Sequence, residues 1–192
     1  MKNAFLILII FLFPMISCKS QIISLEQAVI YEQQTGSIPQ STTYIKDVNN
    51  SLNKYIGIWK GDLNGKTYEF NFIKKENVGG FDVNWDFLVG RLKVSDSNGN
   101  ITYDTSNEQD DLKTKFKGIN FQSDLKAYKM YFVGNSVGCA EYGYVYLRIQ
   151  PSTPLQMTIL MLSDNDIVEE GKCPINFQPT IPYEQLIHLV KQ

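Results

Sequence analysis

The sequence predicts an all-β fold, an antiparallel barrel of eight to nine strands. From Tyr55 onward hydrophobic residues recur at every second position; Tyr68, Phe70 and Phe72 alternate with polar residues in this way. That period is typical of a strand with one buried and one solvated face. Turn sequences such as Asn64-Gly65 separate the segments. Closing the sheet removes exposed edges, so we favour a barrel over the alternative, a β-sandwich.

The first strand contains Trp59 and the second contains Phe70. The later strands are expected over residues 85–95, 101–105, 118–122, 128–133, 141–150 and 155–162. The tail, 183–192, forms either a ninth strand or one short helix. We favour the strand, because Ile187 and Val190 are β-branched and Pro179 and Pro182 come before them.

Residues 1–17 have the pattern of a secretory signal peptide: Lys2, then an apolar run over 4–13, then the small residue Ser17. The run is too short for a transmembrane helix, which needs roughly 20 apolar residues. Cleavage after Ser17 leaves Cys18 as the new N-terminus, where a lipoprotein pattern predicts lipidation. The alternative is an ordinary cleaved signal that leaves a free cysteine.

The cysteine count supports lipidation of Cys18. The chain has three cysteines, an odd number for an exported protein. Acylation of Cys18 leaves Cys139 and Cys173, which flank the two strands expected at 141–150 and 155–162. These strands form one hairpin, so both sulfur atoms lie at the same end of it. We therefore expect a Cys139–Cys173 disulfide.

Three regions follow from these observations: a signal peptide (1–17), the lipidated Cys18 with a polar tether (18–50), and the β-barrel domain (51–192). Gln, Ser and Thr dominate much of the tether, a composition typical of a flexible linker. A short apolar patch that includes Ile22, Ile23 and Leu25 interrupts it. This patch either packs on the domain or forms a helical turn.

Charge argues against nucleic acid as a partner. The formal net charge is −2, and the 18 basic residues are scattered, so the chain lacks a basic footprint for phosphate. Only two basic residues, Arg91 and Arg148, are arginines.

Candidate catalytic groups are few, and we expect the protein not to be an enzyme and to need no cofactor or metal. The single histidine, His188, lies among apolar residues and has no nucleophile motif near it. We expect it to be a packing residue. The acidic pairs Asp82 with Asp86 and Glu169 with Glu170 are expected to be solvated. The run Asp96-x-Asn98-x-Asn100 predicts a hairpin turn, because it lacks the glycine and glutamate spacing of a calcium loop.

Three tyrosines are the most suggestive group for binding. Tyr142, Tyr144 and Tyr146 share one face of the strand expected at 141–150, and apolar residues occupy the other. One face must be core. If the tyrosines are outside, they form a surface or line a cavity suited to an apolar small molecule, a glycan or a protein. The alternative is that they are wall residues with solvated hydroxyl groups.

Gly57-x-Trp59 on the first strand resembles the opening motif of lipocalin-like and calycin-like barrels, in which the tryptophan plugs the closed end. That resemblance implies a basic residue packed over Trp59, and Arg148 is the candidate. The alternative is that Arg148 is a surface residue at a strand end. The whole layout is similar to a family of small Bacteroidetes lipoproteins known only as a domain of unknown function. The shared residues are Ser17-Cys18-Lys19-Ser20-Gln21, Trp59-Lys60-Gly61, Asn64-Gly65-Lys66-Thr67-Tyr68 and Phe70-x-Phe72.

The sequence therefore predicts a non-enzymatic envelope lipoprotein that binds a small hydrophobic or aromatic ligand inside its barrel. The alternative is a protein-binding inhibitor or immunity-type module. Its partners would be the membrane, through the lipid anchor, and a small ligand or an envelope protein. Lys19-Ser20-Gln21 lacks the acidic run found after the cysteine in many surface-exported lipoproteins. We therefore expect an outer-membrane anchor that faces the periplasm.

Overall fold

The computed structural model describes residues 21–79, 82–136, 138–139, 141–164 and 171–192. The expected signal peptide and Cys18 lie outside the described residues. The elements are β1 (Gln21–Ser24), α2 (Leu25–Thr35), β2 (Thr42–Lys46), η1 (Asn53–Tyr55), β3 (Gly57–Leu63), β4 (Lys66–Gly79), β5 (Asn84–Ser95), β6 (Ile101–Asp104), η2 (Asp111–Lys113), β7 (Phe116–Phe121), β8 (Tyr128–Val133), β9 (Tyr142–Ile149), β10 (Gln156–Ser163) and β11 (Leu186–Lys191).

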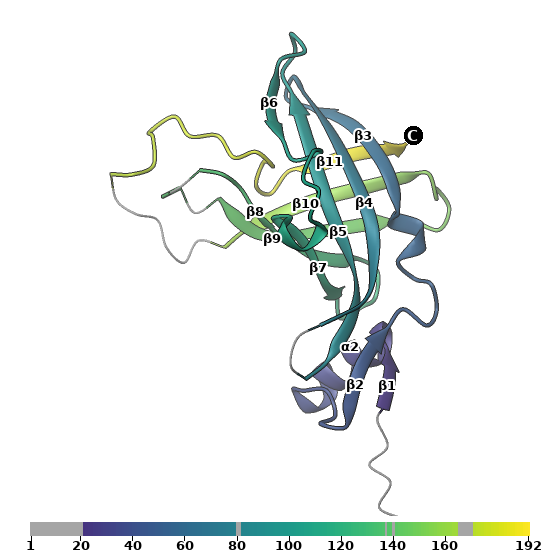
Figure 1. Cartoon of the computed structure of the whole chain (residues 1–192). Coiled ribbons are helices and arrows are strands. Elements are labelled where there is room, and N and C mark those ends of the chain that lie inside the picture. Colours follow the sequence, from purple (N-terminus) through teal and green to yellow (C-terminus); the bar gives the residue numbers. More distant parts are fainter. Residues whose placement is uncertain (1–20, 80–81, 137, 140, 165–170) are drawn as a thin grey trace, which may run out of the picture.

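Eight antiparallel strands close into a barrel (Figure 1). Their order is β5-β4-β3-β11-β10-β9-β8-β7, and β7 returns to β5 through the pair Val89 and Lys117. The predicted all-β barrel is thus confirmed, and closure of the sheet rules out the sandwich. The strand expected at residues 128–133 coincides with β8.

One of the strands expected from the sequence lies outside the barrel, and the C-terminal strand takes a place within it. The segment expected at 101–105 forms β6, which pairs only with β5 and lies off the barrel path. The tail is a strand, as predicted. It enters the barrel as β11, between β10 and β3.

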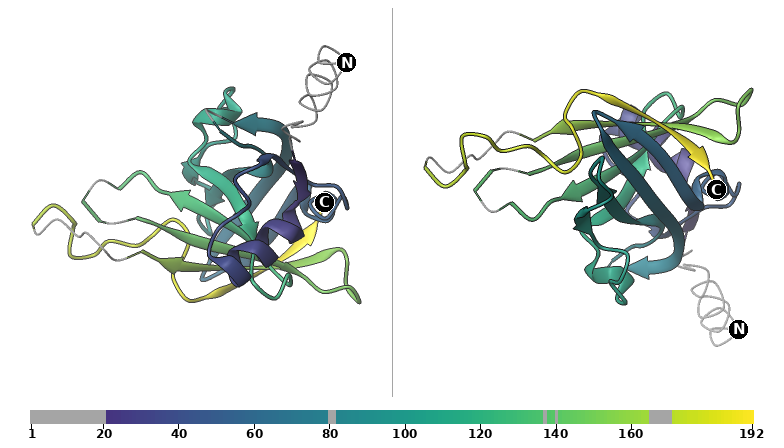
Figure 2. Two further views of the ribbon diagram at one scale, coloured as in Figure 1. Left: turned by 90° about the horizontal axis from the view of Figure 1, so that it is seen from below. Right: turned by 90° about the horizontal axis from the view of Figure 1, so that it is seen from above.

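Residues 21–46 are folded, so the expectation of a flexible tether over 18–50 is wrong for this part. β1 pairs in parallel with β2, and β2 pairs in parallel with β5. Helix α2 buries Leu25, Ala28 and Val29 against the barrel. Seen from below, α2 crosses the lower end of the molecule (Figure 2). A few well-spaced apolar residues therefore outweigh the polar composition of this segment.

Two buried carboxylates join this N-terminal unit to the barrel. Asp86 on β5 accepts hydrogen bonds from the Tyr44 hydroxyl (2.5 Å), the Asp47 amide (2.8 Å) and the Asn77 amide (2.9 Å). Asp47 in turn accepts from the Ser51 amide at 2.7 Å. Burial and, to a smaller extent, the neighbouring Asp86 carboxylate together raise the pKa of Tyr44 to about 12. The Tyr44 hydroxyl therefore stays protonated and remains a donor at neutral pH.

Aromatic side chains fill the barrel interior. Phe72 and Phe116 meet edge to face with ring centroids 5.6 Å apart, and Phe116 and Phe132 do the same at 5.6 Å. Phe70 stacks on Phe72 at 5.9 Å. Gly90 provides room for this packing, because a Cβ atom there would lie 2.6 Å from Cδ1 of Phe116. Contacts of this kind add to the hydrophobic contribution of ring burial.

Candidate functional site

Trp59 is fully buried in the barrel, and its indole is held from two sides. Its Nε1 donates to the backbone oxygen of Tyr55 at 2.7 Å. The Lys191 ammonium lies 5.3 Å from the indole centroid. Gly57 has a φ of +118°, and a Cβ there would lie 3.2 Å from Lys191 Cε. Glycine at this position therefore allows both the backbone conformation and the approach of Lys191.

The cation over Trp59 is thus Lys191, and the expected role of Arg148 is wrong. Arg148 is exposed on the outer face of β9, opposite Thr158 of β10. Lys191 reaches the indole because β11 pairs with β3 and sets Lys191 directly opposite Trp59. That pairing depends on the strand order, which no local sequence pattern reveals.

The expected ligand site inside the barrel coincides with the interior that the aromatic side chains fill. Clefts at the surface, such as the one lined by Arg148, Thr158 and His188, are not lined by these phenylalanines or by Trp59. His188 is exposed on β11, so the expectation that it is a packing residue is wrong. Its neighbours Ile187 and Leu189 are the buried residues.

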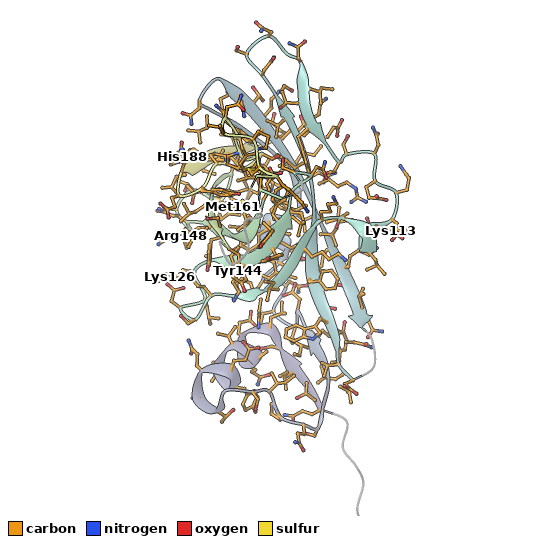
Figure 3. All side chains as sticks on the ribbon, turned by 90° about the vertical axis from the view of Figure 1, so that its left-hand side faces the viewer. Lys113, Lys126, Tyr144, Arg148, Met161 and His188 are labelled. Atoms are coloured by element: carbon orange, nitrogen blue, oxygen red, sulfur yellow. A yellow bond between two sulfur atoms is a disulfide. The ribbon has the colours of Figure 1, made fainter. Side chains whose placement is uncertain are left out.

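The three tyrosines of β9 point outward, which decides between the two faces of this strand. Tyr144 is 38% exposed, and Tyr142 and Tyr146 are half-buried. Val145 and Leu147 on the opposite face are fully buried in the core. Tyr144 is labelled in Figure 3, which looks along β9 from the end that carries the connecting loops.

Neighbouring strands extend this surface. Tyr131 of β8 lies opposite Tyr144, which lies opposite Leu162 of β10. A second row crosses Tyr146, Leu160 and Leu186 of β11. We call this surface the tyrosine face; it comprises Lys129, Tyr131, Tyr142, Tyr144, Tyr146, Leu160, Leu162 and Leu186.

Side-chain contacts order the tyrosine face. The Tyr131 and Tyr144 rings meet edge to face at 5.3 Å, and the Lys129 ammonium lies 5.2 Å from the Tyr144 centroid. The Tyr131 hydroxyl donates to Asp164 at 3.5 Å. Partial burial and the nearby Asp164 carboxylate raise the pKa of Tyr131. These contacts hold the tyrosine rings in place and leave part of each ring exposed.

The predicted disulfide between Cys139 and Cys173 is confirmed, with Cα atoms 4.7 Å apart. It joins the β8–β9 connection to the β10–β11 connection, which project together from one end of the β9–β10 hairpin (Figures 1 and 2). Glu141 braces the same loops: its carboxylate accepts from the Thr180 amide at 2.6 Å and from the Ser136 amide at 3.0 Å. The side chain of Ile175 is fully exposed beyond the disulfide.

The acidic residues singled out in the sequence do not converge. Asp86 is buried in the hydrogen-bond network with Asp47, contrary to the expectation that it is solvated, whereas Asp82 is exposed, as expected. Glu169 and Glu170 lie outside the described residues.

Asp96 accepts hydrogen bonds from the amides of Asn98 and Asn100 at 2.9 and 2.8 Å, which form the hairpin turn that the sequence predicts. Among the described residues, no group of three or more His, Cys, Asp or Glu side chains gathers in a metal-binding arrangement.

Residues 1–150 match the model of a family of unknown function, DUF6705. The chain belongs to this family. The part of the chain that matches the DUF6705 model ends just after β9, so it contains Cys18, Cys139 and the three β9 tyrosines but not Cys173. No curated protein and no solved structure matches the chain. In the described ranges, no helix has the length and apolar character needed to cross a membrane.

Proposed function

We propose that this protein is a non-enzymatic lipoprotein of the cell envelope that binds another envelope protein through the tyrosine face. The main support for the proposal is that this face is continuous across four strands: Leu162, opposite Tyr144, is 39% exposed, and Leu186, opposite Leu160, is 50% exposed. Contiguous exposed apolar patches typically mark interaction sites. Tyrosine is also enriched among the residues that dominate protein–protein binding energy.

The packed interior is the reason for placing binding on the outer face. A small hydrophobic ligand inside the barrel would have to displace aromatic rings such as Phe72 and Phe116, which already contact each other. An inhibitor or immunity-type module needs only a rigid outer surface. The sheet supplies that rigidity, because the tyrosine strands are hydrogen-bonded to neighbours on both sides.

Two observations support a non-catalytic role. His188 is exposed on a strand, and the buried Asp86 carboxylate is occupied by three donors within the protein. Neither side chain is placed as a general acid or base would be, free to exchange a proton with a bound substrate.

The sequence around Cys18 supports anchoring in the envelope. We infer that Cys18 carries the lipid and that the protein faces the periplasm from the outer membrane. Mass spectrometry of protein extracted from envelope membranes tests the anchor. We expect acyl chains on Cys18 in the wild type, and a Cys18→Ser variant that is released into the soluble fraction. An unmodified Cys18 in membrane-extracted protein would contradict this part of the proposal.

Paired surface substitutions test the binding face. Tyr144→Ser with Leu162→Ser removes two exposed apolar groups from the tyrosine face, and Ile101→Ser removes one from β6, where it is also exposed. After chemical cross-linking of intact cells, we expect the wild type and Ile101→Ser to co-purify with the same partner, and the double variant to lose it. Equal recovery with all three proteins, each folded as judged by its melting temperature, would contradict the proposal.

A further inference from the structure

The described chain begins at one end of the molecule, beside the connection between α2 and β2. The Gln21 amide donates to the backbone oxygen of Ser41 at 3.0 Å, and the Ser41 hydroxyl donates to the Gln21 side chain at 3.0 Å. We call this end the N-terminal rim; it comprises Gln21, Ile22 and residues 36–43. It lies at the bottom of Figure 1, below the barrel.

Cys18 stands three residues before Gln21 in the sequence. Three residues of fully extended chain span at most about 11 Å. A lipid attached to Cys18 therefore keeps Gln21, at the edge of the N-terminal rim, within about that distance of the lipidated residue. This step rests on the lipid anchor of the proposed function.

The N-terminal rim is joined firmly to the barrel. Ile23 and Ile45, which adjoin it, belong to the same hydrophobic core as the barrel residues. The Gln33 side chain also donates to the Ser123 backbone oxygen at 2.9 Å, which ties α2 to the β7–β8 connection. An anchor placed next to the rim therefore orients the whole molecule as well as tethering it.

The chemistry of the N-terminal rim suits close contact with lipid headgroups. None of its residues carries a charged side chain, in a chain that is 20% charged overall. Approach to a membrane surface then requires no formal charge to be desolvated, which is the most costly kind of desolvation. Ile22 is 58% exposed on β1. Transfer of its side chain from water to the interfacial region of the membrane is favourable in free energy.

We propose that the N-terminal rim rests directly on the lipid surface and sets the orientation of the anchored protein. In this orientation Tyr144 is held above the N-terminal unit and away from the lipid surface, as Figure 3 shows. The loops joined by the Cys139–Cys173 disulfide stand clear of the membrane above the N-terminal unit (Figure 1). A partner would approach from the periplasmic space along the membrane plane.

Site-specific quenching tests this orientation. Gln40 in the rim and Asn98 in the β5–β6 turn are both exposed. Each is replaced separately, as Gln40→Cys or Asn98→Cys, in the full chain. Cys139 and Cys173 are disulfide-bonded and Cys18 is acylated in the proposal, so the introduced thiol is the one available for a fluorescent maleimide. The lipidated proteins are reconstituted in phosphatidylethanolamine and phosphatidylglycerol vesicles that contain a lipid with a nitroxide headgroup.

We expect strong quenching of the label at position 40 and no quenching above background at position 98. Equal quenching at both positions, with acylation of Cys18 verified by mass spectrometry, would overturn the orientation and leave the anchor intact. A mass without acyl chains would overturn the anchor and the orientation together. Unchanged melting temperatures of the labelled proteins show that neither substitution has altered the fold.

Discussion

At the scale of single residues, side chains that approach each other from distant parts of the sequence stabilise the barrel. Trp59, near the start of the barrel, is covered by Lys191, near its end. The Gly57-x-Trp59 pattern draws attention to a tryptophan that is fully buried in the structure. It does not identify the cation, because Arg148 and Lys191 both lie in segments whose sequence predicts a strand. Only the pairing of β11 with β3 distinguishes them.

Replacing Lys191 by methionine keeps most of the aliphatic length and removes the charge over the indole. We expect the free energy of unfolding to fall by roughly 0.5 to 1 kcal/mol, the usual range for a cation–π contact that is partly exposed. Arg148→Met is the matched control, because Arg148 is exposed and away from Trp59. Urea titration checks both variants. A larger loss in Arg148→Met than in Lys191→Met would contradict the assignment.

The packing of Phe116 makes a second prediction at this scale. Alanine at position 90 places a methyl group 2.6 Å from the Phe116 ring, so the ring must shift. Overpacking of this kind costs about 1 to 3 kcal/mol. We expect Gly90→Ala to lower the urea midpoint, and Gly90→Ala combined with Phe116→Leu to recover part of the loss. No loss in the single variant would show that the interior has room to spare.

At the scale of elements, the sequence identifies strands well and their partners poorly. A period of two residues is a local signal, and it predicts β8, β9 and most of β5. The roles of β6 and β11 depend on closure of the sheet, which is a long-range property. The N-terminal unit is predicted only in part: the apolar patch that includes Ile23 and Leu25 does pack on the core, but the polar composition around it hides β1, β2 and the length of α2. Its signal was present in the sequence: Ser24 and Gln27 form a capping box, and Leu25, Ala28 and Val29 follow helical spacing.

The loops held by Glu141 give a prediction that depends on pH. Burial alone would raise the pKa of Glu141, but the hydrogen bonds from Thr180 and Ser136 outweigh it and lower the pKa. A carboxylate whose pKa is lowered by folding contributes stability above its unfolded pKa, near 4.5, and loses that contribution as the pH falls further. We expect Glu141→Gln to weaken amide protection at Ser136 and Thr180 at pH 7.

Hydrogen exchange followed by mass spectrometry checks this prediction. In the wild type, protection of segments 134–136 and 178–181 should decline as the pH is lowered from 5 to 3, after correction for the intrinsic exchange rate. In Glu141→Gln it should be low already and change less. Protection that is equal in the two proteins at pH 7 would contradict the role of Glu141.

At the scale of the whole molecule, the disulfide and the N-terminal unit fix structure at different parts of the barrel. The disulfide was predictable, because the cysteine count and the expected hairpin are both visible in the sequence. The tyrosine face was predictable only as one of two alternatives. Which face of β9 is buried depends on the curvature and closure of the sheet around aromatic residues from other strands.

The disulfide closes a separation of 34 residues, which corresponds to roughly 3 to 4 kcal/mol on the chain-entropy model. We expect the Cys139→Ser, Cys173→Ser double variant to lose stability of that order in urea titration. Adding a reductant should bring the wild type to the same value and leave the double variant unchanged. A wild type whose stability is insensitive to complete reduction would contradict this contribution.

Site-specific photo-cross-linking in living cells tests whether the tyrosine face binds an envelope protein. A photoreactive phenylalanine analogue replaces Tyr144 in the full chain, and Ile101 on β6 in a matched control. We expect a discrete cross-linked product at position 144 after irradiation, and none at position 101. No product at position 144, or the same product at both positions, would contradict it.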